Sequence, residues 1–120
     1  MGQLGALLLS LAIEVPAAVA LARLARWLAP GQWRRLALTG VAATLLSHPF
    51  AWFGNRALAA LLPFAPRAAV IESCVVLFEA LLYWRLTPLA LRRGLLVSLV
   101  ANALSFGIGL LVYALLQRTS

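Results

Sequence analysis

Four apolar runs, each close to the length of a transmembrane helix, occupy most of this chain of 120 residues. They lie at residues 4–22, 36–54, 68–84 and 94–116. A helix rises 1.5 Å per residue, so about 20 apolar residues cross the ~30 Å hydrocarbon core of a bilayer. Within lipid, every backbone group needs a partner in its own segment, which favours helices. The sequence therefore predicts an all-α polytopic membrane protein, a single domain formed by a bundle of four transmembrane helices.

The composition excludes an ordinary soluble domain. Hydrophobic residues make up 64% of the chain, whereas soluble domains contain about 45–50% apolar residues. The net charge is +7, which in a soluble domain would suggest a nucleic-acid-binding face. Here the arginines lie between the apolar runs, where they meet water and anionic head groups. We therefore expect the lipid bilayer as a partner, and no nucleic acid.

The arginines are distributed unevenly among the connecting segments. The first connection (22–35) contains four and the third (85–93) contains three, whereas the second connection and the C-terminus together contain three. The positive-inside rule places the arginine-rich connections in the cytoplasm. Both termini are then predicted outside the cytoplasm. The apolar second connection, residues 55–67, is predicted to lie in the outer membrane interface.

All the acidic residues of the chain, Glu14, Glu72 and Glu79, lie inside the apolar runs. A carboxylate in the middle of a bilayer is costly unless it is partnered or protonated. Glu72 and Glu79 are two helical turns apart, so they share one helix face. This inverted placement of acidic residues points to a polar interior.

The other three runs carry small and polar residues at spacings of three or four, which place them on one face of each helix. Such residues line contacts between helices in lipid. We predict a buried polar cluster and, beside it, positions of close helix packing. The cluster contains Glu14, Glu72, Glu79, His48, Asn102, Ser105 and Ser98. The packing positions are Gly109, Gly40 and Ala17.

Neither a metal site nor a cofactor site is predicted. The chain has one histidine, His48, and one cysteine, Cys74, whereas zinc and iron sites usually combine several ligands at recognisable spacing. Cys74 is interpreted as a small apolar helix residue. No serine lies in a nucleophile-elbow motif, and no catalytic residue is predicted.

Several short motifs resemble those of a loose family of small bacterial four-helix membrane proteins. The motifs are LAIEVP at 11–16, SHPF at 47–50, E-x2-VV-x2-EA-x2-Y at 72–83 and S-x3-N-x2-SF-x2-GL at 98–110. At 47–49 the family is expected to have Thr-Asn-Pro instead of Ser-His-Pro. The resemblance implies the four-helix architecture and a multi-pass location in the bacterial inner (cytoplasmic) membrane. It implies no particular activity.

The polar interior is compatible with three functions. We favour a structural or accessory subunit, which packs against other membrane subunits or against itself and whose buried polar cluster fixes its own fold. A homo-oligomeric protein that handles protons or cations is the alternative, because acidic residues within membranes often mark ion pathways. A membrane enzyme acting on a lipid is the second alternative, although an enzyme is less expected than a non-enzyme.

Overall fold

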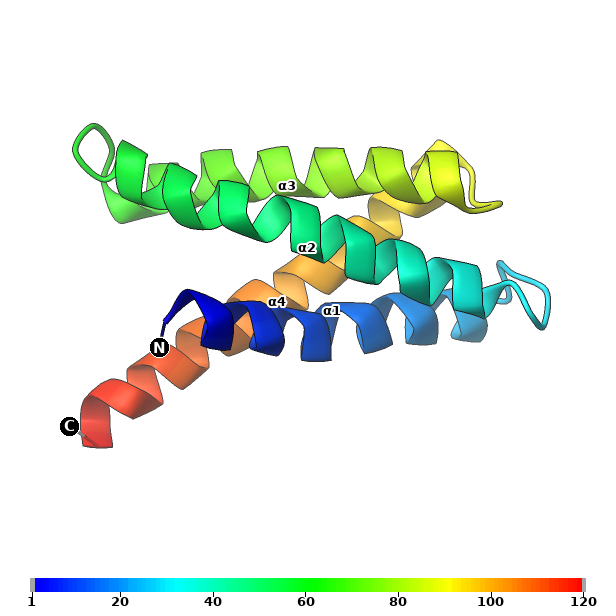
Figure 1. Ribbon diagram of the computed structural model, residues 1–120, viewed down its shortest axis with the longest axis horizontal. Helices are drawn as coiled ribbons and strands as arrows, with labels where there is room; N and C mark the ends of the chain where they lie inside the picture. The colour runs from blue at the N-terminus through cyan, green and yellow to red at the C-terminus, as the bar shows by residue number, and fades with distance from the viewer. Residues whose placement is uncertain (1, 120) are drawn as a thin grey trace.

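The computed structural model describes residues 2–119 and contains four long helices (Figure 1). They are α1 (Gln3–Leu24), α2 (Trp33–Leu58), α3 (Phe64–Leu86) and α4 (Leu91–Thr119). The described residues form no β-strand, so the predicted all-α, four-helix architecture is confirmed. The helices α1, α2 and α4 are long and apolar enough to cross a membrane.

The helix α3 differs from the other three in charge rather than in length. It has 23 residues, but Glu72 and Glu79 interrupt its apolar sequence. Glu79 is turned into the bundle, with 2% of its surface exposed, whereas Leu77 and Leu81 on the outer face are 59% and 49% exposed. The surface that α3 presents outward is therefore largely apolar despite its charges.

All four helices extend beyond the apolar runs from which they were predicted. The largest difference concerns residues 55–67, predicted as an interfacial connection. In the structure α2 continues to Leu58 and α3 begins at Phe64, so only residues 59–63 connect them. Pro66 fits within the first turn of α3, because the backbone N–H that proline lacks would have no helical partner there.

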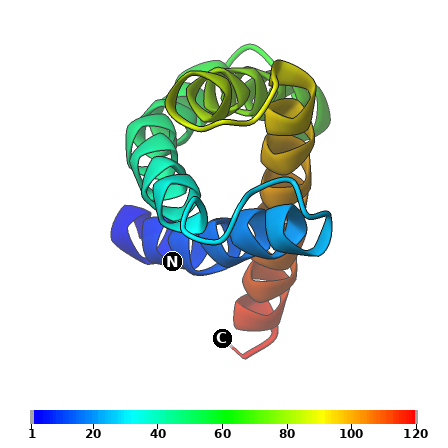
Figure 2. The ribbon, with the colours of Figure 1, turned by 90° about the vertical axis from the view of Figure 1, so that its right-hand side faces the viewer.

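The helices form a closed ring when viewed end-on (Figure 2). The helices α1 and α3 each pack against both α2 and α4, and the two diagonal pairs make no close backbone contact within residues 2–119. The molecule is 45 Å long, close to the ~40–45 Å thickness of a bilayer with its head groups. The α1–α2 and α3–α4 connections lie at one end, which we call the arginine end. Both termini and the α2–α3 connection lie at the other, the terminal end (Figure 1).

Polar and apolar side chains are arranged in the reverse of the order found in soluble proteins. On the outside, Leu38 is 70% exposed and Leu111 is 58% exposed. On the inside, Glu14, Ser98 and Asn102 are 6%, 0% and 5% exposed. Lipid is a solvent in which such an apolar exterior is stable, and water is not.

The half of the ring near the arginine end is filled by side chains. Cβ atoms built at two glycines show how closely the helices approach there. At Gly40 a Cβ would lie 2.9 Å from the hydroxyl oxygen of Tyr83, and at Gly94 it would lie 3.1 Å from the carbonyl oxygen of Ala80. The buried apolar core of this half comprises Ala18, Ala22, Leu36, Tyr83, Leu89 and Val97.

The sharp end of α3 helps to complete this core. Thr87 precedes Pro88 and is extended, with φ −130° and ψ 166°, because a residue before proline is disfavoured in the helical region. The Thr87 hydroxyl donates to the carbonyl of Tyr83 and accepts the backbone N–H of Leu89 at 3.2 Å. These bonds satisfy backbone groups at the turn and place Leu89 against the core.

Candidate functional site

A buried hydrogen-bonded cluster joins α2, α3 and α4 inside the ring. Ser47 Oγ donates to Glu79 Oε2 at 2.7 Å, and Asn102 Nδ2 donates to Glu79 Oε1 at 2.6 Å. All three side chains are buried. We call Ser47, Glu79 and Asn102 the Glu79 clamp. Both carboxyl oxygens have a partner, so the clamp is complete without any added group.

Ser98 strengthens the α3–α4 side of the clamp. Its Oγ donates to the carbonyl of Val76 at 2.8 Å. Asn102 Nδ2 also donates to the carbonyl of Ser98, again at 2.8 Å. The spacing of four between Ser98 and Asn102 puts both on the face of α4 that meets α3. The two helices are therefore joined by side chains at successive turns.

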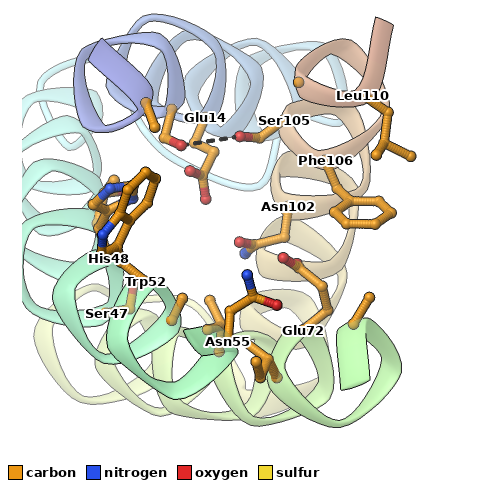
Figure 3. A pocket seen from close by; sticks show the side chains of 18 of the residues that line it. Glu14, Ser47, His48, Trp52, Asn55, Glu72, Asn102, Ser105, Phe106 and Leu110 are labelled. Carbon is orange, nitrogen blue, oxygen red and sulfur yellow. Dashed lines mark hydrogen bonds between the residues drawn. The ribbon is translucent and has the colours of Figure 1, made fainter. Parts of the chain in front are cut away.

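A cavity of about 290 Å³ lies beside the clamp, since Ser47 and Asn102 form part of its wall. Figure 3 shows this cavity from close by. All four helices contribute to its wall. Asn55, Phe64 and Leu110 belong to the wall and are exposed, so the cavity reaches the surface of the protein. Its polar lining consists of Ser10, Glu14, Thr44, Ser47, His48, Asn55, Glu72, Asn102 and Ser105.

Two glutamates outside the clamp point into this cavity, Glu14 from α1 and Glu72 from α3 (Figure 3). Glu14 is 6% exposed, yet its Oε1 atom has no hydrogen-bond partner. Within the described residues, no arginine lies close enough to any of the three glutamates to influence its charge. Buried polar groups are normally paired, so Glu14 Oε1 is an acceptor that residues 2–119 leave without a partner.

His48 lines the same cavity without forming a metal site. Its buried Nε2 atom has no hydrogen-bond partner, and its ring lies 6.1 Å from that of Trp52, between centroids. Residues 2–119 contain no group of three side chains placed to hold a metal ion. His48 therefore adds a polar atom to the cavity wall.

Two weaker contacts join helices around the cavity. Ser105 Oγ donates to Ser10 Oγ at 3.4 Å, a long distance for a hydroxyl pair, so both hydroxyls retain capacity for another partner. At the mouth, Arg67 Nε donates to Asn55 Oδ1 at 2.7 Å. The Arg67 guanidinium also lies over the ring of Phe64, 5.7 Å from its centroid. We call the hydrogen bond between Arg67 and Asn55 the mouth latch, because it ties the end of α2 to the start of α3.

The predicted polar residues divide between the hydrogen-bonded cluster and the cavity. Glu79, Asn102 and Ser98 take part in the hydrogen-bonded cluster, with Asn102 also reaching the cavity. The cavity wall contains Glu14, Glu72, His48 and Ser105.

The predicted packing positions differ in their surroundings. Gly40 lies at a close contact with Tyr83. Ala17 is only partly buried. Gly109 does not lie at a helix contact: a Cβ there would meet no heavy atom within 4 Å, and the residue lines the cavity. The physical reason is that α4 crosses the ring obliquely and its C-terminal end leaves the other helices (Figure 1).

Three residues, one in the clamp, one in the mouth latch and one at the α3–α4 contact, were not predicted. Ser47 completes the clamp, Asn55 forms the mouth latch and Gly94 allows the close approach of α3 and α4. A signal existed for Ser47, because it lies two turns after Gly40 on one helix face. The same spacing was available for the other two, because Asn55 lies two turns after His48 and Gly94 lies four residues before Ser98.

No family model, curated protein or solved structure matches this chain. The function is therefore inferred from the chemistry of the site alone. The cavity offers carboxyl oxygens and hydroxyl groups, with Oε1 of Glu14 unpaired. Such a lining favours a ligand that donates hydrogen bonds and carries positive charge, because a buried carboxylate is stabilised by an opposite charge.

Proposed function

We propose that this chain is a multi-pass protein of the bacterial inner membrane, with four transmembrane helices, that binds a small organic cation in its acidic cavity. The observation that carries the proposal is Glu14, a buried carboxyl aimed into a cavity with Oε1 unpartnered. A ligand with an ammonium group supplies the missing charge and the missing hydrogen bonds together. The cavity volume of about 290 Å³ is near the lower end of small-molecule pockets, which span about 300–1,000 Å³.

A purely structural function accounts for only part of the polar interior. Glu79 has a partner on each oxygen, as expected of a carboxyl that fixes helix register. Glu14 lacks such partners on Oε1, and an unsatisfied buried acceptor destabilises the fold. A role in binding explains why Glu14 lies there. We retain the structural role for the clamp and assign binding to the cavity.

Transport of a cation needs a second opening, and the packed half supports binding without passage. Leu36 and Val97 are 0% exposed and fill the ring toward the arginine end. A through pathway would require this core to separate. We therefore expect purified protein in proteoliposomes to show no flux of alkylammonium ions under an imposed gradient. Saturable flux that Glu14→Gln abolishes would favour the transporter instead.

The orientation that we propose places the cavity mouth outside the cytoplasm. Support comes from the seven arginines in the two connections at the arginine end, because basic segments are retained in the cytoplasm. A reporter fused after Arg35 or Arg92 is expected to be cytoplasmic, and one fused at the C-terminus is expected to be external. A cytoplasmic reporter at the C-terminus would reverse the orientation or remove one spanning helix.

The binding proposal is tested with n-butylammonium and protein in phosphatidylcholine nanodiscs. Trp52 lines the cavity, so its fluorescence should change saturably as the site fills, and Trp52→Phe should remove that change. Glu14→Gln keeps the shape of the side chain but cannot ionise. Because a hydrogen bond to a charged group contributes about 1.5–3 kcal/mol, we expect the variant to bind at least ~10-fold more weakly.

An uncharged analogue, n-butanol, and a negatively charged one, butyrate, serve as ligand controls. Neither n-butanol nor butyrate should produce the saturable change, because neither carries the positive charge. Thermal unfolding of Glu14→Gln, at or above the wild-type temperature, shows that lost binding is not lost folding. Equal affinities of wild type and Glu14→Gln for n-butylammonium would contradict the proposal.

A further inference from the structure

A second concavity lies on the outer surface of the ring, along the seam between α3 and α4. It has a volume of about 400 Å³, and we call it the α3–α4 groove. Apart from two residues, its wall is apolar and contains several alanines. The wall includes Phe64, Ala69, Glu72, Asn102, Ala103 and Phe106.

The groove and the acidic cavity share part of their walls. Phe64, Ala68, Glu72, Asn102 and Phe106 line both. The rings of Phe64 and Phe106 stack across the seam, with centroids 6.4 Å apart and planes inclined by 13°. A single layer of side chains therefore separates the lipid-facing groove from the polar interior. Glu72 is accessible from both sides of that layer.

The seam between α2 and α3 makes a useful contrast. It also bears an outer groove, of about 280 Å³, which shares Ser47 and Val75 with the cavity. The Ser47 hydroxyl is already bound to Glu79, and no carboxyl lines that groove. Unlike the α2–α3 groove, the α3–α4 groove therefore brings an acidic group and an apolar channel together.

We infer that the α3–α4 groove and the acidic cavity form one site for a membrane-dissolved alkylamine, a molecule with an ammonium head and a hydrocarbon chain. The head lies between Glu72 and Glu14, and the hydrocarbon chain leaves past Ala68, beside the stacked rings of Phe64 and Phe106, to lie in the groove. This inference rests on the proposed function, since it assumes that the cavity binds a cation.

The chemistry of the two parts selects this class of ligand. Hydrocarbon fills an outward groove of small side chains, because an empty groove loses dispersion contacts on one side. The head must be cationic to pair with the carboxyls. A phosphate in the head would be brought among the same carboxyls, and the nearest arginine described at the mouth, Arg67, is bound to Asn55. The ligand is therefore an amine without a phosphate.

The test separates the groove from the cavity with a variant that fills only the groove. Ala103 lines the groove and is not part of the cavity wall. In phosphatidylcholine nanodiscs, Ala103→Phe should weaken binding of dodecylammonium at least ~10-fold, because the phenylalanine ring occupies the space of the hydrocarbon chain. Binding of n-butylammonium, which is too short to need the groove, should stay within about twofold of wild type. Both are measured by Trp52 fluorescence at matched amine-to-lipid ratios, so partition into the bilayer cancels.

A matched control and a second variant complete the design. Cys74→Phe fills the α2–α3 groove and should leave both amines unaffected. Ala69→Phe blocks the α3–α4 groove from α3 and should act as Ala103→Phe does.

The outcomes distinguish the two proposals. If both amines bind wild type and neither groove variant weakens dodecylammonium, the lateral site is overturned while the proposed function stands. If neither amine binds wild type, both are overturned. Equal weakening of both amines by the groove variants also overturns the lateral site. Phosphatidylethanolamine, supplied as the nanodisc lipid, should not compete with dodecylammonium for the site. Competition as strong as that of an alkylamine would overturn the restriction to amines without phosphate.

Discussion

In the half of the ring near the arginine end, Leu36 and Val97 fill the interior, whereas in the terminal half Glu14 and Glu72 border a cavity. The same four helices form both halves. In the first half Gly40 lies against the Tyr83 side chain and Gly94 against the backbone of Ala80, whereas Gly109 faces open space in the second. A small residue in a membrane helix thus has two different uses. It can bring helices together, or it can leave room between them.

The two most deeply buried glutamates repeat this contrast at the level of single groups. Glu79 is 2% exposed and Glu14 is 6% exposed, so burial alone does not separate them. Hydrogen bonding does, because Ser47 and Asn102 satisfy both oxygens of Glu79, whereas Glu14 Oε1 has no partner. The first arrangement holds helices together, and the second is suited to receive a ligand.

The largest expected effect on stability comes from removing the Glu79 carboxyl, with the Glu14 carboxyl as the comparison. Glu79→Leu leaves the Ser47 hydroxyl and the Asn102 amide without their acceptor, and we expect a loss of about 2 kcal/mol in the free energy of unfolding. Glu79→Gln retains an acceptor and should lose less. Glu14→Leu removes a carboxyl whose Oε1 has no partner and should unfold no more easily than wild type. Unfolding in mixed micelles with increasing dodecyl sulfate, followed by circular dichroism, gives the three values.

The comparison fails if Glu14→Leu is as destabilised as Glu79→Leu. Both carboxyls would then stabilise the fold, and Glu14 would no longer be an acceptor left free for a ligand. Leu81, which faces outward, supplies a control, since Leu81→Ile should change neither stability nor binding.

Helical periodicity was sufficient to predict the residues of the clamp on α3 and α4. Glu79 and Asn102 were assigned to one polar interior from spacing alone, and the structure joins them by a hydrogen bond of 2.6 Å. On α2 the choice between neighbours was harder, because Ser47 and His48 differ by only about 100° around the helix. Periodicity locates a face to about this precision, so it could not show that Ser47 binds Glu79.

The difference between a filled and an empty interior was beyond sequence reasoning. Gly94 and Gly109 both lie on α4, and only the crossing geometry of α4 makes one a contact and the other a cavity wall. That geometry results from packing along the whole ring, which no local pattern encodes. The number and type of helices were predictable for the opposite reason, since the length and polarity of each run determine them directly.

A smaller effect is expected from adding one methyl group to each half. The Cβ of Gly94→Ala would lie 3.1 Å from the backbone oxygen of Ala80, so α3 and α4 must separate slightly, at a cost of about 1–2 kcal/mol. The Cβ of Gly109→Ala meets open space, and the better helix propensity of alanine should stabilise by up to ~1 kcal/mol. The same unfolding measurement therefore gives changes of opposite sign. Destabilisation of equal size at both positions would mean that the terminal half is packed as tightly as the other.

The smallest expected effect on stability concerns the mouth latch. Arg67 Nε binds Asn55 Oδ1 at 2.7 Å, but Asn55 is exposed and Arg67 is partly exposed. Water or a lipid head group replaces such a contact when it breaks, so the coupling in a double-mutant cycle of Asn55→Ala and Arg67→Gln should be about 0.5 kcal/mol or less. The latch nonetheless crosses the cavity mouth, because Asn55 and Phe64 line the cavity and Arg67 lies over Phe64. Breaking it should therefore speed n-butylammonium entry, measured by stopped-flow Trp52 fluorescence, while the unfolding free energy barely changes. A latch variant destabilised more than Glu79→Leu would show that the terminal end, and not the clamp, holds the helices together.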